Sequence, residues 1–313
     1  MKKKMILILS IVLLVTSTAC ILTSFMEPKA TPEPDTEVSG LLETLAVLQT
    51  KEAEGSNNDE EDQEQEEVVQ EQPTEQPTET PTEIPEPDIC FENVSLNFDQ
   101  QIASAMWGEI VPEYVPEYEG IERHTPDYIK FNFTDYVIQG HFHEPFIAIY
   151  PVAQLIEFDE FTEWHVNTLQ TLIASQPETP EDFPFIPIWN AASLFHSNVE
   201  YVDFQNGSGI RYLTEFGQAY WPVHNDNMFY TFQGITSDGQ YYISAVLPVH
   251  HPNVYQSGEE VPSDWEPYYD EAAWDAYINP TVAMLNGQPG NSFTPCLDLL
   301  DEMIGSITFQ PCP

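Results

Sequence analysis

From residue 88 onward, apolar and polar positions alternate in short segments that predict β-strands. Alternation with a period of two is typical of strands with one face in the core, and four segments show it: "CFENVSLNF", "YIKFNFTDYVI", "VEYVDFQ" and "IRYLTEF". The segment "EPFIAIYPV" is almost continuously apolar, which predicts a more deeply buried strand. Ser237-Asp238-Gly239 joins "MFYTFQGIT" to "QYYISAVLPV", and "NGSG" joins another pair of strands. Strands joined by such short turns predict a mostly antiparallel sheet.

Stripes of apolar residues with helical spacing predict helices between and after the strands. One helix is expected to begin after Asp159, which would cap it. Ser263 and Glu266 form a capping box for a second helix, which Pro280 is expected to end. Thr294 is expected to cap a third helix, close to the C-terminus.

A proline-rich segment separates the first helix from the strand "VEYVDF". Its four prolines, between residues 177 and 187, predict a loop across the surface, and a short helix is expected around residues 191–195. The fold class predicted from all these elements is α+β, with a mostly antiparallel, twisted sheet covered by helices.

The N-terminus reads "MKKKMILILSIVLLVTSTACILTSF", where three lysines precede a long apolar run as in an export signal. "TSTAC" is compatible with a lipoprotein processing site that would leave Cys20 as a lipidated N-terminus. Alternatively, residues 5–25 are long enough to remain as a membrane anchor, and free secretion is the third alternative. The first two alternatives both place the protein on the outer face of the cytoplasmic membrane or at the cell surface.

Three regions follow from these patterns: a signal or anchor segment (1–20), a stalk (21–87) and one globular domain (88–313). The stalk is rich in Glu, Gln, Pro and Thr, and it carries the repeat "QPTEQPTETPTEIPEP". Such a composition predicts a disordered, extended segment. The remaining 226 residues are rich in aromatic side chains and are enough to enclose a sizeable core.

The charge balance excludes several classes of partner. The chain carries a formal charge of −44, and residues 88–313 contain three basic side chains against 33 acidic ones, which leaves −30. A surface of this sign repels phosphate backbones, so we expect no nucleic-acid partner. Solubility in high salt, tolerance of low external pH and attraction of cations are three physical reasons for such acidity.

The cysteines predict a disulfide if the chain is exported. When Cys20 carries lipid, Cys90, Cys296 and Cys312 remain, and one of them stays unpaired. Cys90–Cys312 would tie the two ends of the domain together, and Cys296–Cys312 is the local alternative.

Several stretches of residues 88–313 resemble a family of uncharacterised exported bacterial proteins. They are "FQNGSGIRYLTEFGQ", "YTFQGITSDGQYYISAVLPVHHP", "FHEPFIAIYPV", "NAASLF" and "SFTPCLDLLDEMIGSITF". The resemblance implies no known activity. The order of strands and helices is also similar to the PsbP-like α/β/α sandwich, which is a likeness of architecture alone.

The stretch "GHFHEPF" offers the best candidate for a metal site. On a strand, His141 and His143 would leave the same face and supply two ligands to a divalent metal ion. A third ligand would come from His250, or from His224 or His251. The alternative is that Gly140 and Pro145 mark a strand start or bulge whose polar residues face solvent, and then no cofactor is expected.

Arg211 is one of two arginines after residue 87. On a strand, Arg211 and Glu215 would share a face, so we expect a structural ion pair between them. The alternative, a more specific functional role, is that Arg211 binds an anionic ligand.

The motifs of common hydrolases, G-x-S-x-G, H-E-x-x-H and S-x-x-K, do not occur in the sequence. We therefore expect a non-enzymatic binding or structural module, tethered to the membrane through its N-terminus, with an unknown surface or small-molecule ligand. The alternative is an extracytoplasmic hydrolase or metal-dependent enzyme that uses the His141 and His143 region.

Overall fold

The computed structural model describes residues 86–116, 123–157, 160–265 and 270–312. The predicted signal or anchor segment with Cys20, and nearly all of the predicted stalk, lie outside these residues. Within them, no helix combines the length and the apolar composition needed to cross a bilayer.

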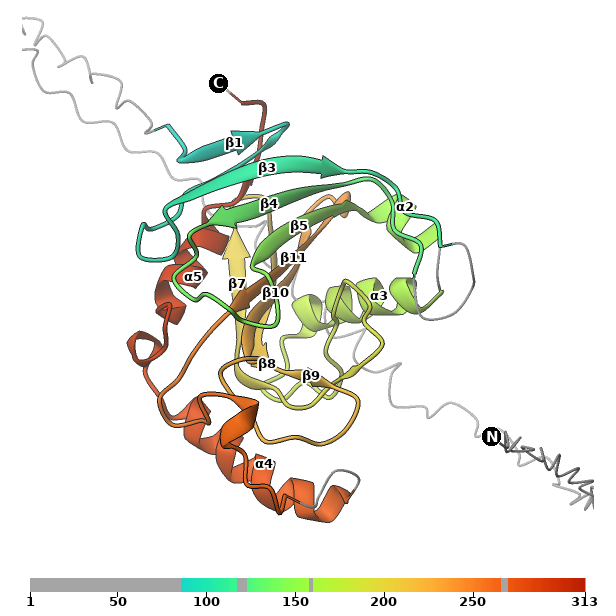
Figure 1. Ribbon diagram of the computed structural model, residues 1–313. Coiled ribbons are helices and arrows are strands. Elements are labelled where there is room, and N and C mark those ends of the chain that lie inside the picture. Colours follow the sequence, from blue (N-terminus) through green and yellow to red (C-terminus); the bar gives the residue numbers. More distant parts are fainter. Residues whose placement is uncertain (1–85, 117–122, 158–159, 266–269, 313) are drawn as a thin grey trace, which may run out of the picture. The chain divides into compact units, whose positions relative to one another are not determined.

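A seven-stranded antiparallel sheet forms the centre of the fold (Figure 1). Each pair of neighbouring strands is antiparallel, as the short turns predicted. In spatial order the strands are β3 (Ala105–Val111), β4 (Tyr128–Thr134), β5 (Phe146–Pro151), β11 (Tyr241–Pro248), β10 (Phe229–Thr236), β8 (Gly207–Thr214) and β7 (Ser197–Phe204).

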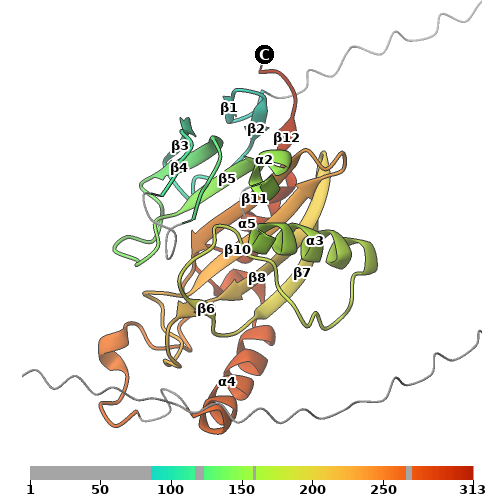
Figure 2. The same cartoon turned by 90° about the vertical axis from the view of Figure 1, so that its right-hand side faces the viewer.

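Helices pack on both faces of this sheet, so the predicted α+β class is confirmed. α2 (Val152–Glu157) and α3 (Glu160–Ser175) cover one face, and α4 (Glu271–Asn286) and α5 (Leu297–Gly305) lie on the other (Figures 1 and 2). β5 shows how the sequence serves both layers: Ile147 and Ile149 join the core beneath α4 and α5, while Ala148 and Tyr150 join the core beneath α2 and α3. The near-continuous apolar run is therefore explained by burial on both faces.

A small sheet holds the two ends of the domain together. It consists of β1 (Ile89–Phe91), β2 (Val94–Leu96) and β12 (Thr308–Phe309), and β12 pairs with β2. The predicted single strand "CFENVSLNF" is wrong, because the chain turns back at Glu92, whose φ is 56°. This turn lets the first and last strands of the domain share one sheet.

Two helices begin later than predicted. α4 begins at Glu271, where the Asp270 side chain accepts a hydrogen bond from Ala273 N, and Pro280 lies inside this helix instead of ending it. α5 begins at Leu297, because the backbone of Thr294 is paired with His250 and does not cap the helix. Ser263 lies eight residues before the start of α4 and does not cap it, so the predicted capping box is wrong. Asp159 and Glu266, the remaining predicted capping residues, lie outside the described residues.

The predicted short helix at residues 191–195 is also wrong. That segment contains β6 (Ala192–Ser193), which pairs with β9 (Phe216–Gly217). The proline-rich loop before it does not simply cross the surface, since Phe185 and Ile186 are buried. Gln233 Oε1 accepts a hydrogen bond from Ile186 N over 2.9 Å, and the Ser244 hydroxyl donates to Ile186 O. Polar side chains inside the sheet therefore anchor this loop.

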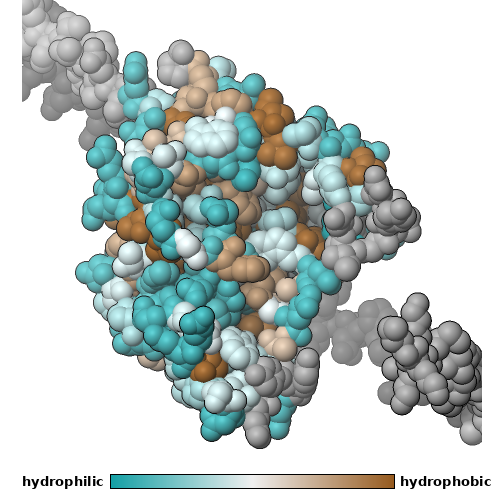
Figure 3. Space-filling view, in the orientation of Figure 1, coloured by the Kyte–Doolittle hydropathy of each residue, from teal (hydrophilic) through white to brown (hydrophobic). Residues whose placement is uncertain are grey.

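The surface of the domain is largely hydrophilic. On the face drawn in Figure 3, hydrophilic residues predominate and hydrophobic residues lie in small, separate areas. Large hydrophobic side chains that are exposed on such a surface, especially where several lie together, indicate a binding site.

Candidate binding site

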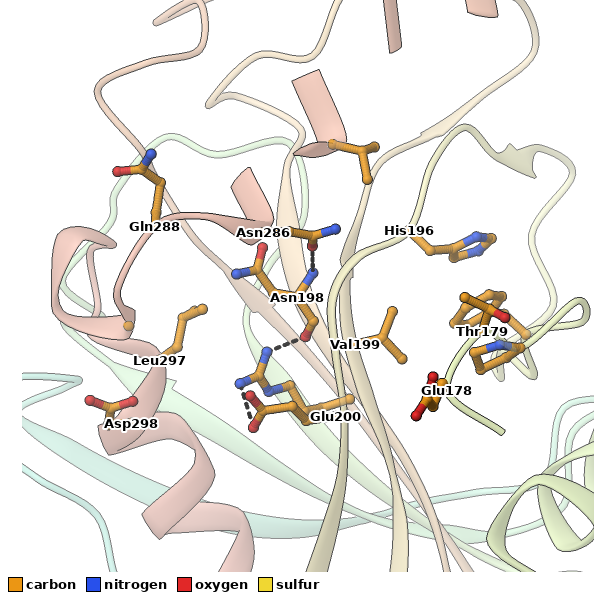
Figure 4. A pocket seen from close by; sticks show the side chains of 15 residues that line it. Glu178, Thr179, His196, Asn198, Val199, Glu200, Asn286, Gln288, Leu297 and Asp298 are labelled. Carbon is orange, nitrogen blue, oxygen red and sulfur yellow. Dashed lines mark hydrogen bonds and ion pairs between the residues drawn. The ribbon is translucent and has the colours of Figure 1, made fainter. Parts of the chain in front are cut away.

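A pocket of about 660 Å³ opens beside β7 and β8, near the end of α4 and the start of α5 (Figure 4). Its volume falls within the range of small-molecule sites, which is about 300–1,000 Å³. Residues from four parts of the chain line it: Glu178 and Phe183 from the proline-rich loop, His196, Asn198, Glu200 and Arg211 from and beside β7 and β8, Asn286 and Gln288 from the end of α4, and Leu297 and Asp298 from α5.

Arg211 is 5% exposed and is held by two carboxylates. Its Nη2 lies 2.9 Å from Glu200 Oε2 and 3.2 Å from Asp301 Oδ2, and its Nη1 donates to Asn198 O. The Tyr230 hydroxyl donates to the second oxygen of Asp301 over 2.9 Å. The guanidinium is therefore fixed in position before any ligand arrives.

The predicted ion pair between Arg211 and Glu215 is wrong. Glu200 lies directly opposite Arg211 on the neighbouring strand β7, whereas β8 ends at Thr214, one residue before Glu215. Glu215 is buried elsewhere, with its Oε1 3.5 Å from His224 Nε2. Side chains four residues apart share a face only within one continuous strand. Because β8 ends before Glu215, that side chain does not share a face with Arg211.

Glu200 is a residue of the candidate site that the sequence patterns did not single out, although a signal for it exists. The turn at "NGSG" sets Phe204 opposite Gly207, and counting outward from that pair places residue 200 opposite residue 211. The other partner, Asp301, comes from α5, 90 residues away, so no local pattern in the sequence indicates it.

Burial alters the pKa values of Asp301 and Tyr230, the residues hydrogen-bonded to each other beside Arg211. Burial raises the pKa of Asp301, and the neighbouring Arg211 guanidinium acts in the opposite direction. Burial also raises the pKa of Tyr230 well above its ordinary value, so this phenol stays a hydrogen-bond donor at neutral pH.

The backbone next to Arg211 is irregular. The register of β7 and β8 shifts between Ser197 and Glu200, and Asn198 adopts a φ of 50°. α4 holds this residue in place: Asn198 N donates to Asn286 Oδ1 over 2.6 Å, and Asn198 Nδ2 donates to Leu285 O over 3.2 Å. Positive φ at a residue other than glycine is concentrated at functional sites.

Three buried polar atoms beside the pocket have no hydrogen-bond partner in the protein. They are Ser197 Oγ, Asn198 Oδ1 and Arg211 Nε. Leaving buried polar atoms unpaired costs free energy, and each such atom in a native protein calls for an explanation. These three atoms are themselves shielded from solvent, so a ligand in the pocket would not contact them without a rearrangement of the surrounding side chains.

The pocket is acidic. Glu178, Glu200 and Asp298 contribute carboxylates to its lining, while its one guanidinium, Arg211, is already ion-paired. Burial lowers the pKa of His196 to about 4, so that this ring adds no positive charge at neutral pH. The arrangement therefore favours a cationic ligand with hydrogen-bonding groups.

The predicted metal residues lie together but do not form a ligand set. Residues 140–145 precede β5 as a loop with Gly140 at a φ of 74°, so the expected same-face strand geometry is wrong. His141 Nε2 lies 3.1 Å from Met228 O, and His143 N donates to His141 Nδ1. The rings of His141 and His250 lie 6.4 Å apart, centroid to centroid.

Histidines 224 and 251, the other predicted third ligands, contact different partners. His224 lies beside Glu215, and the His251 ring packs on Phe293. Within the described residues, no group of three or more His, Cys, Asp or Glu side chains is placed to hold a metal ion. The geometry thus gives the metal-site hypothesis no support.

The structure contains the predicted disulfide that joins the two ends of the domain. Cys90 in β1 and Cys312 after β12 form a disulfide with a Cα–Cα distance of 5.7 Å, and Cys296 keeps a free thiol. The local alternative, Cys296–Cys312, is therefore wrong.

Comparison of the chain with protein-family models, curated proteins and solved structures found no match. The resemblance to exported bacterial proteins and the likeness to the PsbP-like sandwich stay predictions.

Proposed function

We propose that this protein is a membrane-tethered binding module on the outer face of the cytoplasmic membrane or at the cell surface, and not an enzyme. Its N-terminal segment provides the tether, either as lipidated Cys20 or as an uncleaved anchor. The disulfide between Cys90 and Cys312 supports the location, because disulfides persist in extracytoplasmic compartments.

The ligand of the pocket beside β7 and β8 is a small organic cation that also carries hydroxyl groups. The observation that carries this proposal is the acidic lining of the pocket, in which Glu178, Glu200 and Asp298 contribute carboxylates while Arg211 is already ion-paired. The exposed Glu200 carboxylate would accept hydrogen bonds from an ammonium or a hydroxyl group of the ligand. The carboxylates of the lining supply the charge that attracts an ammonium group.

Calorimetric titration of the full chain in detergent with glucosamine and with ethanolamine tests the proposal. Glucose is the uncharged counterpart of glucosamine, and ethylene glycol is the uncharged counterpart of ethanolamine. We expect glucosamine or ethanolamine to bind, with an affinity that falls as salt concentration rises, and glucose and ethylene glycol to bind more weakly or not at all.

Glu200→Gln is the variant of choice, because the Glu200 side chain is 62% exposed and its removal leaves Asp301 on Arg211. We expect it to weaken cation binding severalfold. Glu109→Gln is the control, since Glu109 lies on β3 at the opposite edge of the sheet. Equal binding of glucose and glucosamine, or equal affinity in both variants, would contradict the proposal.

A further inference from the structure

A second hollow lies on the α3 side of the sheet and is lined mainly by aromatic rings. It consists of two adjoining pockets of about 500 and 590 Å³, which share Trp189, Ala191 and Phe216. We call these two adjoining pockets together the aromatic groove.

Exposed aromatic residues line both pockets of the aromatic groove. Phe142, 77% exposed, lines the larger pocket, and Phe161 and Trp164, both exposed, line the smaller one. Large hydrophobic side chains on a highly acidic surface carry a cost in water, and their grouping around one groove indicates a binding role.

The central ring of the groove is held rigidly. Trp189 stacks on His143 with ring centroids 4.5 Å apart and planes 3° from parallel, and it meets the edge of Phe216 at 5.0 Å. The hydrogen bonds from Ile186 N to Gln233 and from the Ser244 hydroxyl to Ile186 O fix the preceding loop. A platform that is ordered before binding loses little entropy when a ligand arrives.

The charge in the larger pocket of the groove is balanced, unlike the rest of the domain. Lys130 and Glu144 are its charged lining residues, and Asn190 and Gln218 contribute amides. The Gln218 Nε2 donates to Asn190 O over 2.8 Å, which fixes the position of the Gln218 amide. The larger pocket is therefore locally neutral in a domain of charge −30, which favours an uncharged ligand there. The smaller pocket adds the carboxylates of Glu181 and Asp182, which can accept hydrogen bonds from ligand hydroxyls.

We infer that the aromatic groove binds an uncharged oligosaccharide. The C–H face of a pyranose ring is apolar with a slight positive polarisation, which matches the negative face of an aromatic ring. Amides and carboxylates at the side of such a platform pair with the sugar hydroxyls. Two adjoining pockets along one groove accommodate consecutive rings of a linear chain better than a single compact ligand.

The test is titration of the full chain in detergent with cellohexaose, fully N-acetylated chitohexaose and maltohexaose, followed by tryptophan fluorescence and calorimetry. We expect saturable binding of at least one of these glycans, with a change in fluorescence because Trp164 and Trp189 line the groove. Phe142→Ala should weaken that binding about tenfold, as expected for one lost aromatic contact of roughly 1.4 kcal/mol.

Three comparisons make the result decisive. Phe142 is so exposed that its loss should leave the fold intact, and Trp107→Ala, at a 49% exposed position on β3, should leave glycan binding unchanged. Glu200→Gln should also leave it unchanged, which separates this site from the pocket of Arg211. Absence of binding to all three glycans, binding of the apolar dye anilinonaphthalene sulfonate alone, or full affinity in Phe142→Ala would overturn the inference.

Discussion

Acid should destabilise this protein through histidines that are buried in their neutral form, and His196 offers the clearest test. Its ring stacks on Phe183 with centroids 3.7 Å apart, and its Nε2 lies 2.9 Å from Ser193 Oγ. Burial lowers the pKa of His196 from 6.5 to about 4. His141 and His143 have their pKa values lowered to about 4 as well, also mainly by burial.

The sign of the effect follows from proton binding. Between pH 6.5 and 4 the unfolded chain binds a proton at residue 196 and the folded protein does not, so acidification favours unfolding. A shift of one pKa unit corresponds to about 1.4 kcal/mol, and between pH 7 and 5 the difference for this one ring amounts to about 2 kcal/mol. The loss begins near pH 6.5 and is complete below pH 4.

Urea unfolding at pH 7 and pH 5 measures this quantity in the wild type and in His196→Phe. Phenylalanine keeps the stacking on Phe183, and the lost contact to Ser193 costs about 1 kcal/mol at either pH. The fall in the free energy of unfolding from pH 7 to pH 5 should therefore be about 2 kcal/mol smaller in the variant.

Trp107→Phe is the control, because it changes a ring on the exposed edge strand β3 and removes no titratable group. Its fall in stability should equal that of the wild type. If His196→Phe also falls as steeply as the wild type, then the ring of His196 does not resist protonation in the folded state and the reasoning is wrong.

Two further predictions concern the disulfide and the buried carboxyl group. Cys90→Ser should lower the free energy of unfolding by up to about 5 kcal/mol, since the bond closes a loop with a sequence separation of 222 residues, whereas Cys296→Ser should change little; urea unfolding of both variants checks this. Burial raises the pKa of Glu215 to about 8, so this group stabilises the fold fully below pH 4.5 and loses that contribution as pH rises through 8. In Glu215→Gln, the change in stability between pH 5 and pH 7 should lack this loss of roughly 2 to 3 kcal/mol, as chemical denaturation at the two pH values would show.

The sheet was predictable because its information is local. Hairpin turns such as Asp238-Gly239 fix both the pairing and the direction of the adjacent strands, and the alternation of apolar residues fixes which side faces each core. The same reasoning, carried as far as the register, would have paired Arg211 with Glu200.

Features that depend on contacts between distant segments were not predictable from local patterns. Asp301 reaches Arg211 only because α5 packs against β7. The proline-rich loop is buried because Gln233 and Ser244, both inside the sheet, bond to Ile186. For the predicted metal histidines, the sequence correctly indicated residues that lie close together but not what they contact. His141 is hydrogen-bonded to backbone atoms, and the spacing of histidines in the sequence does not reveal this.

The pocket of Arg211 and the aromatic groove share a wall, and this decides which variants can assign a ligand to either site. Phe183 and His196 line both the pocket beside β7 and the nearer part of the groove, and their rings are stacked. A substitution at either residue alters both sites at once, so a lost affinity would not identify the site responsible. Glu200 lines only the pocket and Phe142 only the groove. Weaker cation binding in Glu200→Gln with unchanged glycan binding, together with weaker glycan binding in Phe142→Ala with unchanged cation binding, is therefore the pattern that two separate binding sites require.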